Sequence, residues 1–192
     1  MILDLLDILP NRIKGIPRFK AFLLGFVRKP GWRFAKLPEG IKIPINLNNY
    51  SEIPIWLGSY DNRIQKFLYS NLKPNSTFID CGSNIGIWSL LACSYYKIHS
   101  GKVISFEANP ALVKRLIETL STNHLSHIWD IIDEAVSDHE GHLTLDIHDT
   151  THEMSKIAVN NEDVVWGNPL KVKCTSLDSM AIDNNLIGLK ID

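Results

Sequence analysis

Apolar residues recur at helical spacing in the first part of this chain. The spacing predicts helices over residues 2–9, 17–28 and 62–72. Between the second and third of these helices, residues 30–60 are rich in proline and glycine, and isoleucines alternate with other residues over residues 41–45. Pro44 lies within that alternation. Because a proline cannot donate a hydrogen bond to a neighbouring strand, we expect an edge strand there.

From Thr77 onwards, short apolar runs alternate with amphipathic ones. The runs predict strands at residues 77–81, 102–107 and 129–136, separated by helices at residues 84–96 and after Asn109-Pro110. Asparagine caps helix starts and proline fits their first position, which supports the second of these helices. The β-α-β-α-β order indicates an α/β fold with a parallel sheet and right-handed crossovers.

The last third of the chain has weaker patterns. Alternating residues predict short strands at residues 143–147 and 170–174, of which the first has one solvated face. We expect a long polar loop over residues 148–168, a helical turn over 176–182 and a further strand of the main sheet over 187–192.

The stretch from Thr77 to Gly86 organises this pattern. An apolar run ends on Asp80, glycines follow at positions 82 and 86, and a helical pattern begins immediately afterwards. A strand, a tight glycine turn and a helix N-terminus bring backbone N–H groups close to a nucleotide-like ligand. The stretch therefore predicts a cofactor loop.

Three predicted strands each end on an acidic residue, namely Asp80, Glu107 and Asp192. Ligands of open α/β sheets bind outside the carboxyl ends of the strands. Glu107 follows Gly86 by 21 residues, the distance at which an acid accepts hydrogen bonds from two ribose hydroxyls. A purely structural turn with incidental acids is the alternative.

The loop distinguishes between two nucleotide cofactors. A dinucleotide fingerprint has three glycines, Gly-x-Gly-x-x-Gly, whereas this chain has Asn84 where a middle glycine would be needed. A carboxylate at the start of the loop would also repel a pyrophosphate and attract an ammonium group. These features favour S-adenosylmethionine over NAD, and an NAD-linked oxidoreductase is the weaker alternative.

Four motifs carry a resemblance to a known family. They are Asp80-Cys81-Gly82-Ser83-Asn84-Ile85-Gly86, Phe106-Glu107-Ala108-Asn109-Pro110, Ala135-Val136-Ser137-Asp138 and Leu189-Lys190-Ile191-Asp192. In this order they resemble the FkbM family of S-adenosylmethionine-dependent methyltransferases, from about residue 40 to the end. The resemblance implies a Rossmann-like class I methyltransferase fold, a three-layer α/β sandwich. Residues 1–39 would then form a helical extension and residues 40–192 the methyltransferase domain.

The resemblance also implies roles for individual residues. The first loop would hold the methionine part of S-adenosylmethionine, Glu107 the ribose, and Glu134 with Ala135 would border the adenine. Asp192 would lie near the transferred methyl group as the catalytic residue. The full set of expected cofactor-binding residues is Asp80, Gly82, Asn84, Gly86, Glu107, Asn109, Glu134 and Ala135.

The chain departs from the family pattern in two substitutions and in length. Ser83 replaces the usual alanine, and Ala108 replaces the usual proline. The family continues beyond Lys-Ile-Asp with further strands, so the resemblance implies a C-terminally truncated domain whose sheet is incomplete and has an exposed edge. We expect O-methyl transfer to a small-molecule, sugar or lipid hydroxyl, or alternatively a non-catalytic S-adenosylmethionine-binding remnant or interaction module that self-associates through that edge.

Charge is distributed unevenly along the chain. The net charge is −1, but residues 1–45 carry nine Lys or Arg against three acids, a net of +6. The balance of the whole chain favours no nucleic-acid partner. A helix over residues 17–28 would either pack its apolar face on the main domain or lie on an anionic membrane surface.

The remaining composition indicates an ordinary cytoplasmic protein. The three cysteines form no Cys-x-x-Cys pair, which argues against a disulfide framework or a zinc site. No apolar run reaches the length of a membrane span, and the N-terminus lacks a basic start typical of a signal peptide. Histidines and acids crowd residues 138–153, where a solvated face is expected rather than a metal site.

Overall fold

The computed structural model describes residues 2–11, 13–28, 30–58, 62–148, 155–158, 168–180 and 186–191. The chain forms two compact units, Met1–Lys66 and Phe67–Asp192, which are described separately below. A domain boundary between residues 39 and 40 stays a prediction from the sequence. Within the described residues, no helix combines the length and apolarity needed to cross a membrane.

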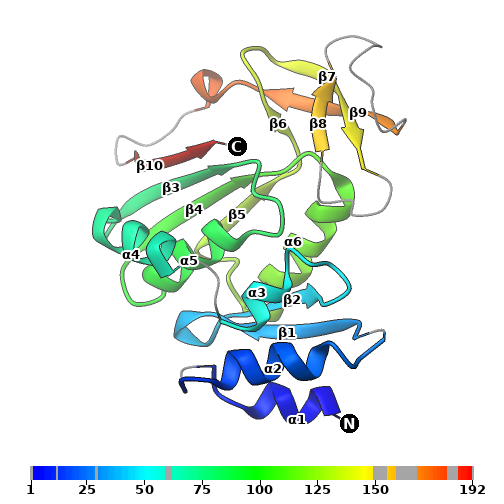
Figure 1. Cartoon of the computed structure of the whole chain (residues 1–192). Coiled ribbons are helices and arrows are strands. Elements are labelled where there is room, and N and C mark those ends of the chain that lie inside the picture. Colours follow the sequence, from blue (N-terminus) through cyan, green and yellow to red (C-terminus); the bar gives the residue numbers. More distant parts are fainter. Residues whose placement is uncertain are drawn as a thin grey trace. The chain divides into compact units, whose positions relative to one another are not determined.

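The first unit combines helices with a small antiparallel sheet (Figure 1). Its elements are α1 (Ile2–Ile8), α2 (Ile16–Leu24), β1 (Trp32–Lys36), η1 (Pro38–Gly40), β2 (Lys42–Asn46) and α3 (Ile53–Trp56), and α4 (Asn62–Asn71) begins in it. The predicted edge strand is β2, which pairs only with β1 among the described strands. Pro44 lies opposite Phe34, and the isoleucines at 41, 43 and 45 are fully buried.

α2 differs from the sequence prediction in its length and in the face that it buries. The helix ends at Leu24 rather than at residue 28, and Gly25 follows it. Its buried residues are Lys20 and Leu24, whereas Phe19 and Phe22 are exposed. The apolar face, for which the sequence left packing and a membrane surface open, is therefore exposed at these two phenylalanines.

The second unit is built on a parallel sheet with the strand order β10-β3-β4-β5. Its strands are β3 (Ser76–Cys81), β4 (Gly101–Phe106), β5 (Trp129–Ile132) and β10 (Leu186–Ile191). The register places Asp80 beside Lys190 of β10 on one side and beside Ser105 of β4 on the other. The α/β fold with a parallel sheet is thus confirmed, and the strand expected at 187–192 pairs with the opening strand.

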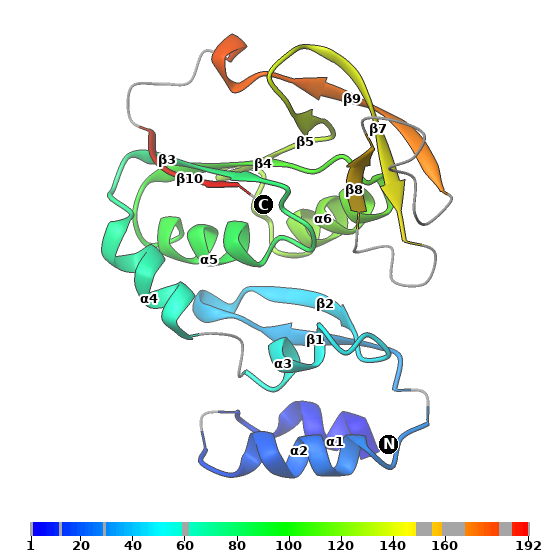
Figure 2. The same ribbon diagram turned by 45° about the horizontal axis from the view of Figure 1, so that its top comes forward.

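Two helices cover one face of this sheet. α5 (Ile87–Tyr96) and α6 (Pro110–Thr122) lie on the same side of β3 and β4 (Figure 2). Asn109 caps α6 as predicted, since its side chain accepts a hydrogen bond from the Ala111 amide at 3.0 Å. On the strands, Ile79, Cys81 and Phe106 form a buried cluster that also packs against Leu177 and Met180.

A second sheet follows the main one, with the order β6-β9-β7-β8. Its strands are β6 (Ala135–Val136), β7 (Gly141–Ile147), β8 (Ser155–Ala158) and β9 (Pro169–Thr175), and η3 (Leu177–Ser179) follows. Two predictions were wrong here. The strand expected over 129–136 divides between the two sheets, because Asp133 and Glu134 separate β5 from β6. The loop expected over 148–168 contains β8.

β10 lies at an edge of the main sheet among the described strands. Leu186, Leu189 and Ile191 on this strand are exposed. An incomplete sheet and self-association through its edge stay predictions from the sequence.

Candidate cofactor site

The loop after β3 has an unusual backbone. Gly82, Asn84 and Gly86 all adopt positive φ, at 70°, 54° and 83°. Such a conformation favours glycine, and asparagine is among the few other residues that tolerate it. Asn84 thus gives the loop the backbone shape of a middle glycine while adding an amide side chain. The loop still differs from a dinucleotide fingerprint in this side chain and in the position of its last glycine, which is residue 86 rather than 87.

Asp80, at the end of β3, is fully buried. Its Oδ2 accepts hydrogen bonds from the Ser89 hydroxyl at 2.5 Å and the Ser89 amide at 3.2 Å. Its Oδ1 lies 3.1 Å from the Lys190 ammonium nitrogen. Burial raises the pKa of this carboxyl above its ordinary value, and Lys190 and Ser89 oppose that shift by stabilising the carboxylate. Ser89 therefore holds Oδ2 by hydrogen bonds, whereas Oδ1 meets the geometry of an ion pair with Lys190 but not that of a hydrogen bond.

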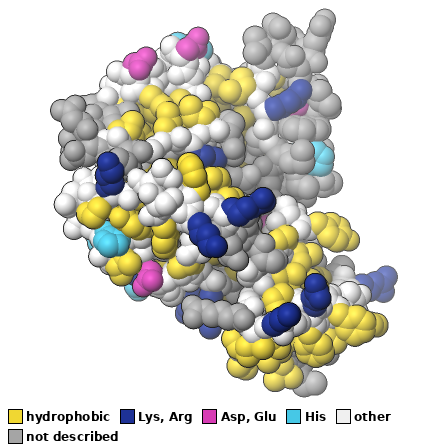
Figure 3. Space-filling model, turned by 60° about the vertical axis from the view of Figure 1, so that its left-hand side comes forward, with side chains coloured by type: hydrophobic (Ala, Val, Ile, Leu, Met, Phe, Trp, Pro, Cys, Tyr) yellow, Lys and Arg dark blue, Asp and Glu magenta, His cyan; other side chains and the backbone are white. Residues whose placement is uncertain are grey.

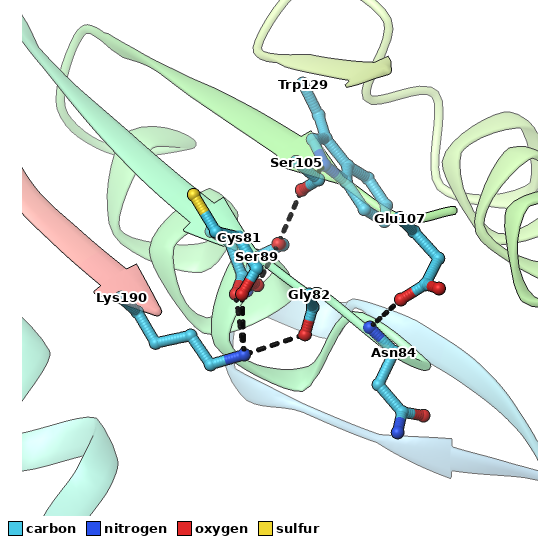
Figure 4. A network of polar contacts seen from close by, with 9 residues as sticks. Cys81, Gly82, Asn84, Ser89, Ser105, Glu107, Trp129 and Lys190 are labelled. Carbon is cyan, nitrogen blue, oxygen red and sulfur yellow. Dashed lines mark hydrogen bonds and ion pairs between the residues drawn. The ribbon is translucent and has the colours of Figure 1, made fainter. Parts of the chain in front are cut away.

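A chain of buried hydroxyls extends from Asp80 across the sheet (Figure 4). The Ser89 and Ser105 hydroxyls are 2.6 Å apart, and the Trp129 indole nitrogen is 2.6 Å from the Ser105 hydroxyl. Because an indole only donates and a carboxylate only accepts, the direction of every bond follows. Trp129 donates to Ser105, Ser105 to Ser89, and Ser89 to Asp80. β5, β4, α5 and β3 are thereby joined beneath the glycine loop.

Lys190 reaches the glycine loop from β10 (Figure 4). Its ammonium donates to the Gly82 carbonyl at 2.8 Å and to the Cys81 carbonyl at 3.4 Å, in addition to its ion pair with Asp80. Of these acceptors, the Asp80 carboxylate is the one expected from the sequence to attract a cofactor ammonium. Because Lys190 pairs with Asp80, the charge of Asp80 alone does not distinguish S-adenosylmethionine from NAD.

Glu107 joins two loops immediately after β4. Its Oε2 accepts from the Asn84 amide at 2.8 Å, and its Oε1 accepts from the Asn109 amide at 2.9 Å. Burial raises the pKa of this carboxyl, while the hydrogen bonds from the Asn109, Asn84 and Ala108 amides oppose the shift. A carboxylate has about four acceptor positions. Glu107 can therefore hold the two loops and still accept hydroxyl hydrogens from a ligand.

The other expected cofactor residues take different positions. Asn109 is almost fully buried, caps α6 and donates from Nδ2 to the Ser155 hydroxyl at 3.2 Å. Glu134 and Ala135 follow the carboxyl end of β5, and Ala135 pairs with Cys174 in the second sheet. Ile132 at the end of β5 accepts a hydrogen bond from the Glu107 amide at 3.1 Å. The segment containing Glu134 thus starts at the same edge of the sheet as Glu107.

Gly86 serves packing at the start of α5. A Cβ atom added to it would lie 2.7 Å from Leu116 Cδ2 and 3.3 Å from Trp129 Cη2. Neither neighbour belongs to the loop, so this glycine lets α5 approach α6 and β5. The close approach that the sequence predicts at Gly86 is therefore made to the core of the protein.

The residues of this edge fit a nucleoside cofactor in two respects. Glu107 has about four acceptor positions, more than the hydrogen bonds from the Asn84, Asn109 and Ala108 amides occupy. The Ser83 hydroxyl, within the glycine loop, is buried and has no hydrogen-bond partner among the described residues. A polar group left in that state is costly unless something satisfies it. Asp192, the expected catalytic residue, lies outside the described residues, although β10 ends at Ile191 beside Cys81.

Four residues of the network, namely Lys190, Ser89, Ser105 and Trp129, were not assigned any role from the sequence. Lys190 was noted only as part of a motif, and Ser89 and Ser105 were not singled out. The sequence offers one signal for Ser89. It is a serine in the helix that follows a strand ending on an acid. Nothing in local spacing connects Lys190 to Asp80, because the two residues are far apart in the sequence and meet only through β-strand pairing.

The described residues include all three cysteines and part of the candidate metal ligands. All three cysteines are free and buried, and burial raises the pKa of the Cys81 thiol to about 11, with Asp80 adding to the shift. Cys81 thus acts as a packing residue in the cluster with Ile79 and Phe106. No group of three or more metal-ligating side chains occurs in the part of the chain that the structure describes. Asp149, His152 and Glu153 lie outside it.

Comparison with known families settles the class of protein. The sequence profile of the methyltransferase FkbM domain matches residues 80–192. The chain belongs to the FkbM methyltransferase family. The match begins at Asp80 and includes all four motifs described above. S-adenosylmethionine is the cofactor that membership of this family implies.

Solved structures show partial similarity to this FkbM-family chain. Pyrococcus horikoshii TYW2 in complex with MeSAdo has 16% identity and a TM-score of 0.43, over 62% of this chain and 47% of that one. The Pyrococcus abyssi tRNA (uracil-54, C5)-methyltransferase in complex with S-adenosyl-L-homocysteine has 9% identity and a TM-score of 0.39, over 55% and 27%. The chain thus spans less than half the length of either. No curated protein matches it significantly.

Proposed function

We propose that this chain binds S-adenosylmethionine at the carboxyl edge of β3, β4 and β5. The observation that carries the proposal is the position of Glu107, whose carboxylate holds the Asn84 amide of the glycine loop at 2.8 Å. A ribose acceptor and a loop of backbone amides are thereby fixed to one another before a ligand arrives. Preorganisation of this kind reduces the cost of ordering the site on binding.

The individual residues divide the cofactor between them in this proposal. Glu107 accepts hydrogen bonds from the ribose hydroxyls, and the loop around Gly82 and Asn84 meets the methionine end. Glu134 and Ala135 border the adenine, since they follow β5 at the same edge of the sheet. Family membership supports these roles together with the strand register. Asn109 acts indirectly, because its backbone amide and its helix cap hold Glu107 and α6 in place.

Lys190 and Asp80 form the floor of this proposed site. Their charges are paired, so the loop presents no net negative field from Asp80. The methionine end of the cofactor is a zwitterion and would meet this neutral pair. The Lys190 ammonium could then donate to the carboxylate of the methionine end in place of the Gly82 carbonyl. This role of Lys190 distinguishes the proposal from one that relies on Asp80 alone.

We further propose that the chemistry is methyl transfer to a hydroxyl of a small molecule, sugar or lipid. Bound S-adenosylmethionine would supply an electrophilic methyl group. The protein's contribution to such a displacement is chiefly alignment. Asp192, immediately after β10, would orient or deprotonate the acceptor hydroxyl. Turnover measured with Asp192→Asn tests that role, and unchanged turnover rules it out.

Calorimetric titration with S-adenosylmethionine and with NAD tests the binding proposal. S-adenosylmethionine should bind and NAD should not. Glu107→Gln should weaken the binding by roughly tenfold or more, since hydrogen bonds to charged groups contribute about 1.5–3 kcal/mol each. Glu118→Gln is the matched control, because Glu118 is an exposed acid on α6. A thermal melt confirms that each variant folds. Equal affinity of Glu107→Gln and the natural sequence would refute the proposal.

A further inference from the structure

α2 presents a row of aromatic side chains to solvent. Phe19, Phe22 and Phe26 follow one another at helical spacing, and 48%, 64% and 74% of their surfaces are exposed. We call these three residues the phenylalanine stripe. The rings of Phe22 and Phe26 are in edge-to-face contact, with centroids 5.1 Å apart. The stripe therefore continues past the helix end at Leu24 as one apolar surface.

The opposite side of α2 provides its packing face. Lys20 is almost fully buried, and its ammonium lies 5.1 Å from the centre of the Trp56 ring. Leu24 is buried on the same side of the helix. Burying a lysine while three phenylalanines stay outside reverses the usual preference of a surface helix. Exposed apolar residues in such a group mark a contact surface.

The charges in the chain segment that contains the stripe have one sign. Between Asp7 and Glu39 the chain carries eight Lys or Arg residues and no acid. Lys14, Arg18 and Arg28 are exposed, and no ion pair found among the described residues uses them. The two acids of α1 are already engaged, because Arg33 lies 3.4 Å from Asp4 and 3.7 Å from Asp7. Figure 3 shows Lys and Arg side chains among the hydrophobic ones at the height of α1 and α2.

We propose that the phenylalanine stripe docks on an anionic lipid bilayer. The stripe would enter the head-group region, where aromatic rings are favoured, and the exposed cations would meet lipid phosphates and carboxylates. α2 is too short to cross a bilayer and would lie in the plane of the interface. Charge complementarity selects the partner, since a basic, acid-free segment is attracted to the anionic surface of a membrane.

The burial of the three natural cysteines allows a direct test. Phe22→Cys introduces a single accessible thiol, which can be labelled with an environment-sensitive fluorophore such as NBD. Ile117→Cys is the control, because Ile117 on α6 is also an exposed apolar residue, at 52%. With vesicles containing phosphatidylserine, NBD emission should rise severalfold and shift to the blue at position 22 only. With phosphatidylcholine vesicles, neither position should respond.

Sedimentation with the same vesicles measures the contributions of apolar and charged residues. Phe22→Ser combined with Phe26→Ser should lower the affinity at least tenfold, and Arg18→Gln combined with Arg28→Gln by about 25-fold, since each cation near the surface contributes about fivefold. Salt at about 1 M, where the screening length is about 3 Å, should release the protein. Circular dichroism checks that the variants keep their helices.

Three results would overturn the proposal. They are an absence of binding to phosphatidylserine vesicles, equal binding of the serine variant and the natural sequence, and an equal NBD response at positions 22 and 117. Self-association lost in the serine variant, without vesicle binding, would instead assign the stripe to a protein contact. None of these measurements depends on S-adenosylmethionine, so they stand or fall separately from the proposed cofactor site.

Discussion

Replacing Lys190 by methionine tests how the glycine loop is held. Methionine keeps most of the side-chain volume and removes the charge that faces Asp80. Because Asp80 is fully buried and only 11% of the Lys190 side chain is exposed, the change leaves a buried carboxylate without its counter-charge. Such losses cost about 3–5 kcal/mol. We expect the free energy of unfolding to fall by about 3 kcal/mol, the lower end of this range, since Ser89 still donates two hydrogen bonds to Asp80.

The loss of stability in Lys190→Met should become smaller as the pH falls. Burial already raises the pKa of Asp80, and removing Lys190 raises it further. Between the unfolded pKa, about 3.9, and the raised folded pKa, the folded state holds a proton that the unfolded state has released. Lowering the pH through this window therefore favours folding. The deficit of Lys190→Met should be full at neutral pH and shrink as the solution is acidified.

Urea unfolding of four proteins measures these effects. They are the natural sequence, Lys190→Met, Asp80→Asn and the double variant, each studied at neutral and at acidic pH. The double variant should be more stable than Lys190→Met, because it no longer buries an unpaired charge. A deficit below about 1 kcal/mol at neutral pH, or one that stays constant on acidification, would refute this account of the ion pair.

Three further predictions concern the same loop. Ser83→Ala should raise the free energy of unfolding by about 1 kcal/mol, because the buried hydroxyl lacks a partner among the described residues; a loss of stability in urea would contradict this. Gly86→Ala should lower the free energy of unfolding by about 3 kcal/mol, and Gly40→Ala, a control outside the loop, by about 1 kcal/mol. Both glycines have positive φ, but only Gly86 has a close neighbour, Leu116. Equal shifts in melting temperature would contradict a packing role for Gly86. S-adenosylmethionine affinity should fall on acidification through the raised pKa of Glu107, because the protonated carboxyl loses acceptor capacity; a flat calorimetric titration from roughly pH 8 to pH 5 would exclude this role.

The main sheet could be predicted from the sequence because its strands carry their own signals. The run that ends on Asp80, the capped helix after Asn109 and the order of strands and helices are local features, and all appear in the structure. β8 could not be predicted, because the sequence Ser-Lys-Ile-Ala has no strand pattern of its own. It is a strand through its pairing with β7, and strand preference depends heavily on such tertiary context.

The candidate site was predictable only in part, for a related reason. Glu107 and the glycine loop were found by their spacing. The partners of Asp80 were not, since Lys190 meets it through pairing between strands that are distant in the sequence. The orientation of α2 was also hidden. Periodicity identifies two faces of a helix but cannot show which is buried when the outer face is aromatic and the inner one contains Lys20.

The pairing of β10 with β3 bears on the order of folding. Lys190 and Cys81 are 109 residues apart, whereas β3, β4 and β5 follow one another closely. Contacts between nearby segments form early because closing a short loop costs less entropy, so β10 should join last. Until it does, Asp80 would be partly enclosed without its counter-charge, and its proton would be held most tightly. The docking of β10 is then a step that releases a proton, and acidifying the solution should disfavour it relative to the undocked chain.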